Sequence, residues 1–143
     1  MWALLRSAAI AALAFSVAGE AGGASQVKIS GIYSDLYFNE EGGDLLGTEI
    51  MIVPVGSGEW AVFHQHWEGS SRFPVAVPAN VKGDRISFKV QHPVEGDEKP
   101  EPATQYEGRI SAQGFEGTYR HPLTDGTMQS EPIKLKRKKS YWE

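Results

Sequence analysis

The sharpest local feature of the sequence is the run His64-Gln65-His66. Residues i and i+2 of a β-strand project from the same face, so both imidazoles could approach one metal ion. A metal site needs at least one more ligand, and His92 or His121 could supply it only if the fold brought them near. Paired histidines on a strand without a metal are far commoner. We therefore expect no metal and no cofactor, with His64 and His66 as the only weak candidates for ligands.

Four carboxylates gather in the first third of the chain, at Asp35, Glu40, Glu41 and Asp44. A Ca²⁺ ion takes several carboxylate oxygens, and this group could supply them. Their spacing does not place ligands at the alternate positions of a calcium loop. The spacing favours solvated loop carboxylates.

The usual signatures of catalysis are missing from the sequence. It contains no cysteine, no Gly-x-Ser-x-Gly run, no phosphate loop and no dinucleotide fingerprint. Glu107 and Glu116 lie on neighbouring predicted strands, and paired carboxylates can do acid–base work. Both fall on the polar side of their strands near Arg109 and Arg120, which favours surface charges. We expect no enzymatic activity.

The N-terminus predicts export. Residues 1–6 carry a single positive charge, and Ser7–Val17 is an uncharged apolar run of eleven residues followed by small residues. This order is typical of a secretory signal peptide, and the run is shorter than the roughly twenty apolar residues that span a bilayer. We expect residues 1–18 to be a signal peptide, with cleavage as late as residue 24. The mature protein would be periplasmic or secreted and would not span the membrane.

Period-two alternation, which is typical of half-buried strands, recurs through the rest of the chain. It is clearest where Ile86, Phe88 and Val90 alternate with polar residues. Eight strands are predicted, near 26–34, 46–55, 59–67, 72–78, 84–91, 104–110, 114–120 and 129–137. Short, sequential, glycine-containing connections favour an up-and-down antiparallel barrel over a sandwich. The fold class is all-β, with a barrel over residues 26–139 and a tail at 140–143.

Two segments lack this alternation. Residues 36–44 predict a long, acidic first connection, and residues 92–102 predict a mobile, proline-rich surface loop. Each arm of the hairpin around 111–114 carries an aromatic residue, a glutamate and a glycine in order. The two glycines, Gly108 and Gly117, predict a sharp bend or the close approach of another backbone.

The overall charge argues against nucleic acid as a partner. A formal net charge of −4 gives a mildly acidic chain, which repels a phosphate backbone. Basic residues crowd only near the C-terminus, at Lys134, Lys136, Arg137, Lys138 and Lys139. They could meet an anionic envelope surface, but outward lysines on a final strand are the interpretation we favour.

Gly31-Ile32-Tyr33 lies on the first predicted strand, and Arg137 lies on the last. In these positions the chain resembles the lipocalins and related calycins, whose first strand carries Gly-x-Trp and whose last strand carries an Arg or Lys that packs over the ring. Tyrosine replaces tryptophan here, and the family's disulfides are absent. The aromatic-Glu-Gly hairpin and the closing residues 140–143 are also similar to small exported bacterial domains of uncharacterised function. The resemblance implies a barrel with an interior and does not imply a particular ligand.

Aromatic residues are numerous enough to fill such a barrel or to line a site within it, because eight strands enclose side chains or one small ligand. The leading hypothesis is a non-enzymatic barrel that binds a small hydrophobic molecule, with the 36–44 segment as a lid. The residues expected to line that site are Tyr33, Phe63, Trp67, Phe88 and Tyr106.

The competing hypothesis is a protein-interaction module, such as an inhibitor or an envelope-associated adaptor. It would use an outer apolar strip around Trp60 or the proline-rich loop. Residues 50–53 and 60–63 are apolar on both faces, so the sequence leaves open which face of the 46–67 strands is buried.

Overall fold

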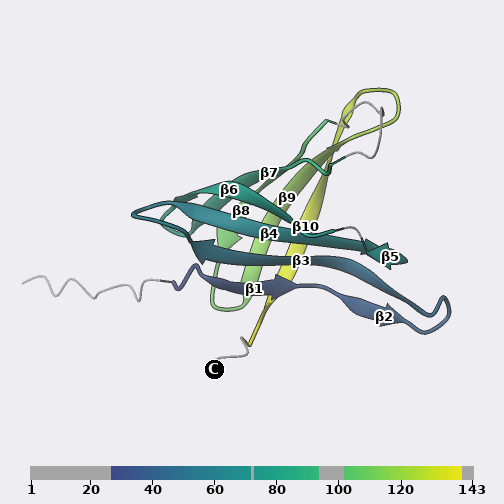
Figure 1. The fold of residues 1–143 in the computed structure, drawn as a ribbon, viewed down its shortest axis with the longest axis horizontal. Coiled ribbons are helices and arrows are strands. Elements are labelled where there is room, and N and C mark those ends of the chain that lie inside the picture. Colours follow the sequence, from purple (N-terminus) through teal and green to yellow (C-terminus); the bar gives the residue numbers. More distant parts are fainter. Residues whose placement is uncertain (1–26, 72, 94–101, 140–143) are drawn as a thin grey trace, which may run out of the picture.

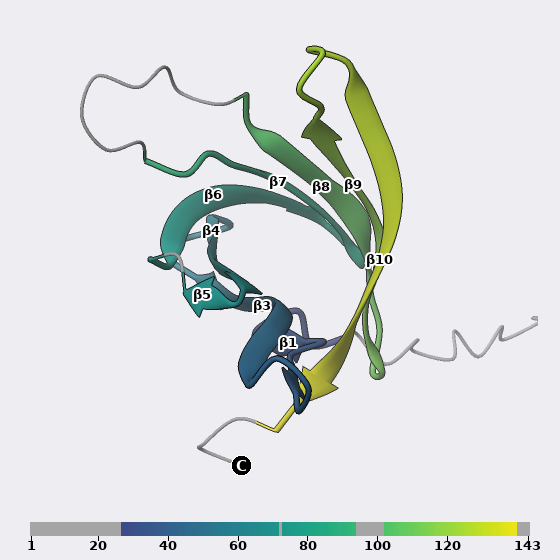
Figure 2. The same cartoon turned by 90° about the vertical axis from the view of Figure 1, so that its right-hand side faces the viewer.

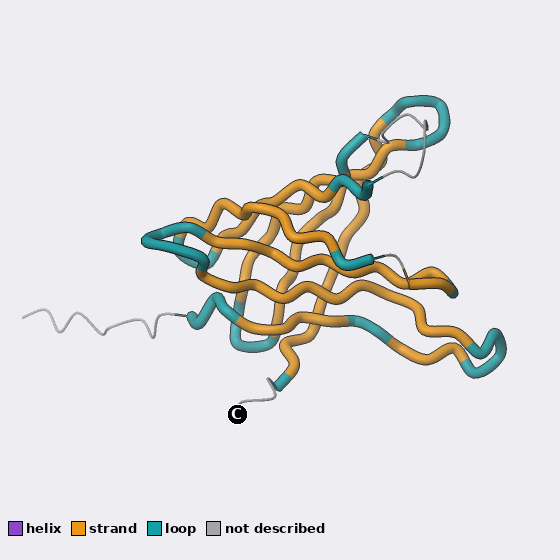
Figure 3. Tube along the Cα trace, viewed as in Figure 1, coloured by secondary structure: helices purple, strands orange, loops and turns teal. Residues whose placement is uncertain are grey.

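The computed structural model describes residues 27–71, 73–93 and 102–139 (Figure 1). Strands and their connections make up these ranges, with no helix among them (Figure 3). None of the described residues therefore belongs to a helix long and apolar enough to cross a membrane. The predicted signal peptide, the tail at 140–143 and most of the predicted 92–102 loop lie outside the described residues. The strands are β1 (Gly31–Ser34), β2 (Tyr37–Asn39), β3 (Asp44–Pro54), β4 (Trp60–Glu68), β5 (Ser70–Ser71), β6 (Val75–Lys82), β7 (Arg85–Val90), β8 (Thr104–Ile110), β9 (Gly114–Pro122) and β10 (Met128–Lys138).

Eight of these strands close into an antiparallel barrel. The hydrogen-bonded order runs β3-β1-β10-β9-β8-β7-β6-β4, and the pairing of β3 with β4 closes the ring. Figure 2 shows the sheet curling so that β10 returns to β1. The up-and-down barrel predicted from the sequence is confirmed, and each of the eight predicted strands is present.

The first connection differs from the prediction. Residues 36–44 were expected to form a long loop, but β2 pairs with the start of β3 and makes a hairpin there. Just before β2, the side chain of Asp35 also bonds to β3: its Oδ1 accepts a hydrogen bond from the Thr48 backbone N at 2.6 Å. The Asp35 backbone N also donates to Thr48 O at 3.1 Å, so pairing with β3 continues beyond the end of β1.

Apolar side chains fill one end of the barrel. Alternation puts Ile86, Phe88 and Val90 inside on β7, as predicted, and all three are buried. This filled end is the closed end of the barrel. Its fully buried apolar side chains are Tyr33, Ile50, Ile52, Val62, Ile86, Ile110, Phe115 and Leu135. Burying an Ile, Leu or Phe side chain stabilises a fold by about 1.5–3 kcal/mol, so this cluster is the main source of stability in a chain without disulfides.

The predicted close approach at the two hairpin glycines is confirmed. Gly108 on β8 and Gly117 on β9 are direct register partners. A Cβ added to Gly117 would lie 2.6 Å from the Gly108 Cα. The two backbones therefore touch at a point where no side chain fits between them.

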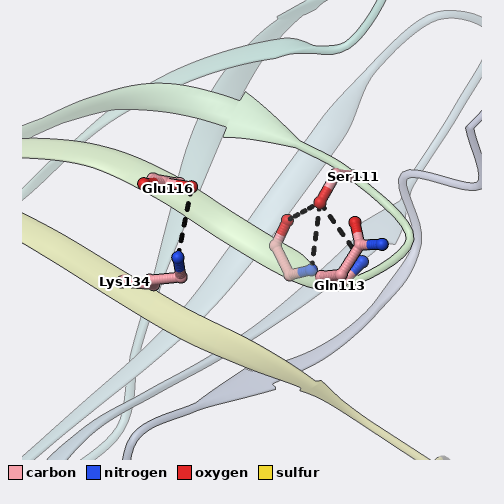
Figure 4. A network of polar contacts seen from close by, with 5 residues as sticks. Ser111, Gln113, Glu116 and Lys134 are labelled. Atoms are coloured by element: carbon pink, nitrogen blue, oxygen red, sulfur yellow. Dashed lines mark hydrogen bonds and ion pairs between the residues drawn. The ribbon is translucent and has the colours of Figure 1, made fainter.

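The Ser111 hydroxyl reinforces the turn between these two strands (Figure 4). Ser111 Oγ accepts hydrogen bonds from the backbone N atoms of Gln113, at 3.2 Å, and Gly114, at 3.3 Å. The nearby ion pair of Lys134 with Glu116, at 3.6 Å, is exposed on both sides and contributes little to stability. Lys134 is one of the outward lysines predicted for the last strand, where Ile133 and Leu135 are buried.

Arg137 differs from its lysine neighbours, because it lies over the closed end of the barrel. Its guanidinium carbon is 4.8 Å from the centroid of the Tyr33 ring, and its Nη2 donates to Tyr33 Oη at 2.6 Å. Arg137 also donates to the carbonyls of Lys28 and Ser30. Tyr33 Oη in turn donates to Ile29 O at 2.6 Å. Burial raises the pKa of the Tyr33 hydroxyl, and the Arg137 charge opposes that shift. The hydroxyl therefore stays protonated and can donate to Ile29 O.

Arg137→Ala is expected to lower the free energy of unfolding by about 1–2 kcal/mol, because it removes a stacked cation and its hydrogen bonds to the segment before β1. Arg120→Ala, at an exposed position on β9, is the matched control and should change stability by less than about 0.5 kcal/mol. Urea unfolding followed by tryptophan fluorescence measures both. Equal midpoints for the two variants would show that the Arg137–Tyr33 contact does not stabilise the barrel.

Candidate ligand-binding site at the barrel mouth

All four histidines of the chain line one cavity of about 430 Å³. They come from separate places: His64 and His66 from β4, His92 from the segment after β7, and His121 from β9. The cavity lies at the end of the barrel opposite Arg137, and this open end is the mouth of the barrel. The cavity volume is within the range of small-molecule sites, about 300–1,000 Å³. The other residues that line it are Asp35, Gly47, Thr48, Glu68, Val90, Thr104, Tyr106, Tyr119, Pro132, Ile133 and Lys134.

His64 is the most deeply buried polar group of this site, with only 2% of its surface exposed. Its Nε2 is 2.9 Å from Tyr106 Oη. Its Nδ1 is buried and has no hydrogen-bond partner among the described residues. Burial lowers the pKa of His64 to about 3, and the neighbouring His92 and His66 add to the shift. His64 is therefore a neutral imidazole with one nitrogen available to a ligand.

A row of stacked aromatic side chains, the ring wall, forms one side of the barrel interior. Phe88, Tyr106 and Tyr119 are successive cross-strand partners on β7, β8 and β9. Ring centroids are 4.8 Å apart for Phe88 and Tyr106, and 5.8 Å apart for Tyr106 and Tyr119. His121 continues the stack at 5.4 Å from Tyr119. The stacked rings cover one another's faces, so Tyr106 and Tyr119 can offer ring edges to an apolar group in the cavity.

One hydrogen-bonded carboxylate, Glu131, lies at the Tyr119 and His121 end of this wall. Glu131 accepts from Tyr119 Oη at 2.8 Å, and its other carboxylate oxygen is 3.2 Å from His121 Nε2. Partial burial and the Glu131 carboxylate raise the pKa of Tyr119 to about 12, so its hydroxyl stays protonated. Across the cavity, Thr48 Oγ1 is 3.0 Å from His66 Nδ1. The mouth is therefore polar, while the core beneath it is apolar.

No protein-family model, curated protein or solved structure matches this chain. What the cavity binds must therefore be inferred from its own residues.

The structure separates the five residues that were expected to line a ligand site. Phe88 and Tyr106 face the interior, and Tyr106 lines the cavity. Tyr33 is also inside, but at the closed end under Arg137. Phe63 and Trp67 lie on the outer face of β4, because alternation gives the inner positions to His64 and His66.

The two candidate metal ligands, His64 and His66, share the inner face of β4 as the i, i+2 spacing predicts. Each has a hydrogen-bond partner of its own, Tyr106 for one and Thr48 for the other. Within the described ranges, no group of three or more His, Asp or Glu side chains is arranged to hold a metal ion.

The early acidic cluster is divided between two places. Asp35 bonds to Thr48 at the cavity, whereas Asp44 pairs with Asn39 in the β2–β3 hairpin, with 3.4 Å between Asn39 Nδ2 and Asp44 Oδ1. Glu40 and Glu41 are exposed at the hairpin tip.

Sequence reasoning missed the contributions of Glu68, Tyr119 and Glu131 to the site. Alternation in β9 carried part of the signal, since Phe115, Gly117 and Tyr119 share the inner face with His121. Nothing in the local pattern could show that this face meets Glu131 of β10 or the inner face of β4.

Proposed function

We propose that this chain is an exported, non-enzymatic barrel of the lipocalin or calycin type that binds one small molecule in its mouth. The observation that carries the proposal is the unpartnered, buried Nδ1 of His64 beside a cavity of small-molecule size. A buried polar atom without a partner costs about 1–3 kcal/mol, and a ligand that bonds to it recovers that cost.

The contacts of His64 support binding over catalysis. Its one hydrogen-bond partner among the described residues is a tyrosine hydroxyl, and burial holds its pKa at about 3. A general base works best when its pKa is near the operating pH, so His64 would be a poor one. Recognition is the role that suits a neutral, fixed imidazole.

The resemblance to lipocalins supports the family assignment that we propose. The stacking of an arginine from the last strand on the aromatic residue of Gly31-Ile32-Tyr33 is the arrangement that the resemblance implies. The mouth itself changes the expected ligand. Histidines, tyrosines and carboxylates line it, so we propose an amphipathic ligand with a flat apolar part and a polar group, instead of a purely hydrophobic one.

Thr104→Trp should abolish ligand binding, because it places an indole in the cavity that Thr104 lines. Gln105→Trp is the matched control: Gln105 is exposed on the outer face of β8, one residue away. Native mass spectrometry of protein purified without denaturation should show a stoichiometric added mass in wild type and Gln105→Trp, and the apo mass in Thr104→Trp.

A neutral fluorescent probe, N-phenyl-1-naphthylamine, gives a second readout that does not depend on a co-purified ligand. Its affinity should fall at least about tenfold in Thr104→Trp alone, which corresponds to about 1.4 kcal/mol. Unchanged probe affinity and an apo mass for all three proteins would refute binding in the mouth.

A protein-interaction role is the second candidate, and one observation favours it. Met51 and Phe63 are cross-strand partners on the outer face of β3 and β4, and they are 38% and 40% exposed. Ile32 and Ala76 extend this row across β1 and β6. Trp60, which was expected to centre the strip, packs against the core instead.

A further inference from the structure

We propose that the ligand of the mouth is a small organic cation, an ammonium group attached to an aromatic or other flat apolar body. This inference rests on the proposed function and names the chemical class of its ligand. It combines the charges at the mouth, the ring wall and the unpartnered imidazole nitrogen.

Negative charge converges on the ring wall. The Asp35 and Glu68 carboxylates line the cavity, and Glu131 bonds to Tyr119. Glu68 is the last residue of β4 and Asp35 directly follows β1, so separate strands bring these two carboxylates to the cavity. Three carboxylates around one cavity attract a cation and repel an anion.

The positive charges of Lys134 and Arg137 do not balance these carboxylates. Lys134 is the only Lys or Arg among the described residues that line the cavity, and its Nζ pairs with Glu116 at 3.6 Å on the exposed side of β10. Arg137 lies at the closed end of the barrel over Tyr33. The carboxylates of the mouth are therefore left to be balanced by histidines, water or a bound cation.

The ring wall suits the apolar body of such a ligand. Tyr106 and Tyr119 both line the cavity, and because their rings are stacked along the sheet they offer apolar ring edges for the body to pack against. The Glu131 carboxylate accepts from the Tyr119 hydroxyl, so negative charge lies beside the apolar surface.

The imidazole of His64 can accept a hydrogen bond from such a ligand. When Nε2 carries the proton and donates to Tyr106 Oη, Nδ1 keeps a free lone pair. An ammonium N–H would donate to that lone pair and would favour this tautomer. A neutral imidazole also adds no charge repulsion to a cationic ligand.

A matched set of probes tests the ligand class: 2-phenylethylamine, 2-phenylethanol and 3-phenylpropionate share one ring and a similar chain but carry positive, zero and negative charge. Isothermal titration calorimetry at about pH 8 keeps the amine charged and leaves histidines of ordinary pKa neutral. We expect the amine to bind at least tenfold more tightly than the alcohol, and the carboxylate to bind most weakly.

Glu68→Gln tests whether the Glu68 carboxylate strengthens binding of the amine. Glu68 is exposed at the end of β4, so the variant should fold, and its amine affinity should fall about three- to tenfold while its alcohol affinity stays the same. Glu107→Gln makes the same charge change on the outer face of β8 and should leave both affinities unchanged.

The outcomes separate the two proposals. Equal affinities for amine and alcohol, tighter binding of the carboxylate, or equal losses in Glu68→Gln and Glu107→Gln would overturn the cation inference and leave the ligand-binding barrel standing. No binding of any probe up to about 10 mM, together with unchanged N-phenyl-1-naphthylamine affinity in Thr104→Trp, would overturn both.

Discussion

Gly117→Ala should prevent the barrel from reaching its native state or lower its free energy of unfolding by more than about 3 kcal/mol. A Cβ at this position would lie 2.1 Å from Glu107 O and 2.6 Å from the Gly108 Cα. Both contacts are with backbone atoms of the neighbouring strand, so no side-chain rotation relieves them. The strands would have to separate at the centre of the β8–β9 pairing, where Gly108 and Gly117 are partners.

Gly56→Ala is the matched control for this substitution. A Cβ there would approach the Glu59 carboxylate oxygen at 2.7 Å, and that flexible side chain can move away. Its unfolding free energy should stay within about 0.5 kcal/mol of wild type. Soluble yield, far-ultraviolet circular dichroism and urea unfolding measure all three proteins. Wild-type folding and stability in Gly117→Ala would show that β8 and β9 are free to separate.

This glycine pair also shows why much of the fold could be predicted. Strand alternation, turn residues and the repeated aromatic-Glu-Gly sequence are local signals, and each reports on backbone within a few residues of itself. They predicted eight strands, their antiparallel order and the close approach at Gly108 and Gly117. An up-and-down barrel then follows, because each predicted strand pairs with the next along the chain and the last pairs with the first.

The faces of β3 and β4 could not be predicted, because apolar residues occupy both. Met51 and Phe63 lie outside, whereas Ile50 and Val62 lie in the core. Which set is buried depends on strands that are distant in sequence. The hairpin at 36–44 was missed because β2, at three residues, is too short to show an alternation of its own.

The candidate site was even less accessible to sequence reasoning. The i, i+2 spacing placed His64 and His66 on one face, and this much was confirmed. The convergence of His92 and His121 on the same cavity is a property of the closed barrel. Strand alternation predicts whether a side chain points into or out of the sheet. Which inward-pointing side chains lie close together depends on how the barrel closes.

The buried imidazole at the base of the site should make stability depend on pH. In the folded protein the pKa of His64 is about 3, whereas its ordinary value is 6.5. Between these values the unfolded chain binds a proton that the folded chain does not, so stability falls as the pH is lowered through 6.5 towards 3. The expected slope is about 1.4 kcal/mol per pH unit below pH 6, or about 2 kcal/mol lost from this group between pH 7.5 and pH 5.

Two variants test that His64 causes the loss. His64→Gln removes the titrating group. Between pH 7.5 and pH 5 its free energy of unfolding should therefore fall by about 2 kcal/mol less than that of wild type. Tyr106→Phe removes the bond to Nε2 but keeps the imidazole buried, so it should retain the wild-type slope, because burial is the main cause of the low pKa. Urea unfolding at intervals from pH 7.5 to pH 5 gives the slopes. A slope in His64→Gln as steep as in wild type, or His64 ring resonances that titrate near pH 6.5, would show that this imidazole is not held neutral by the barrel.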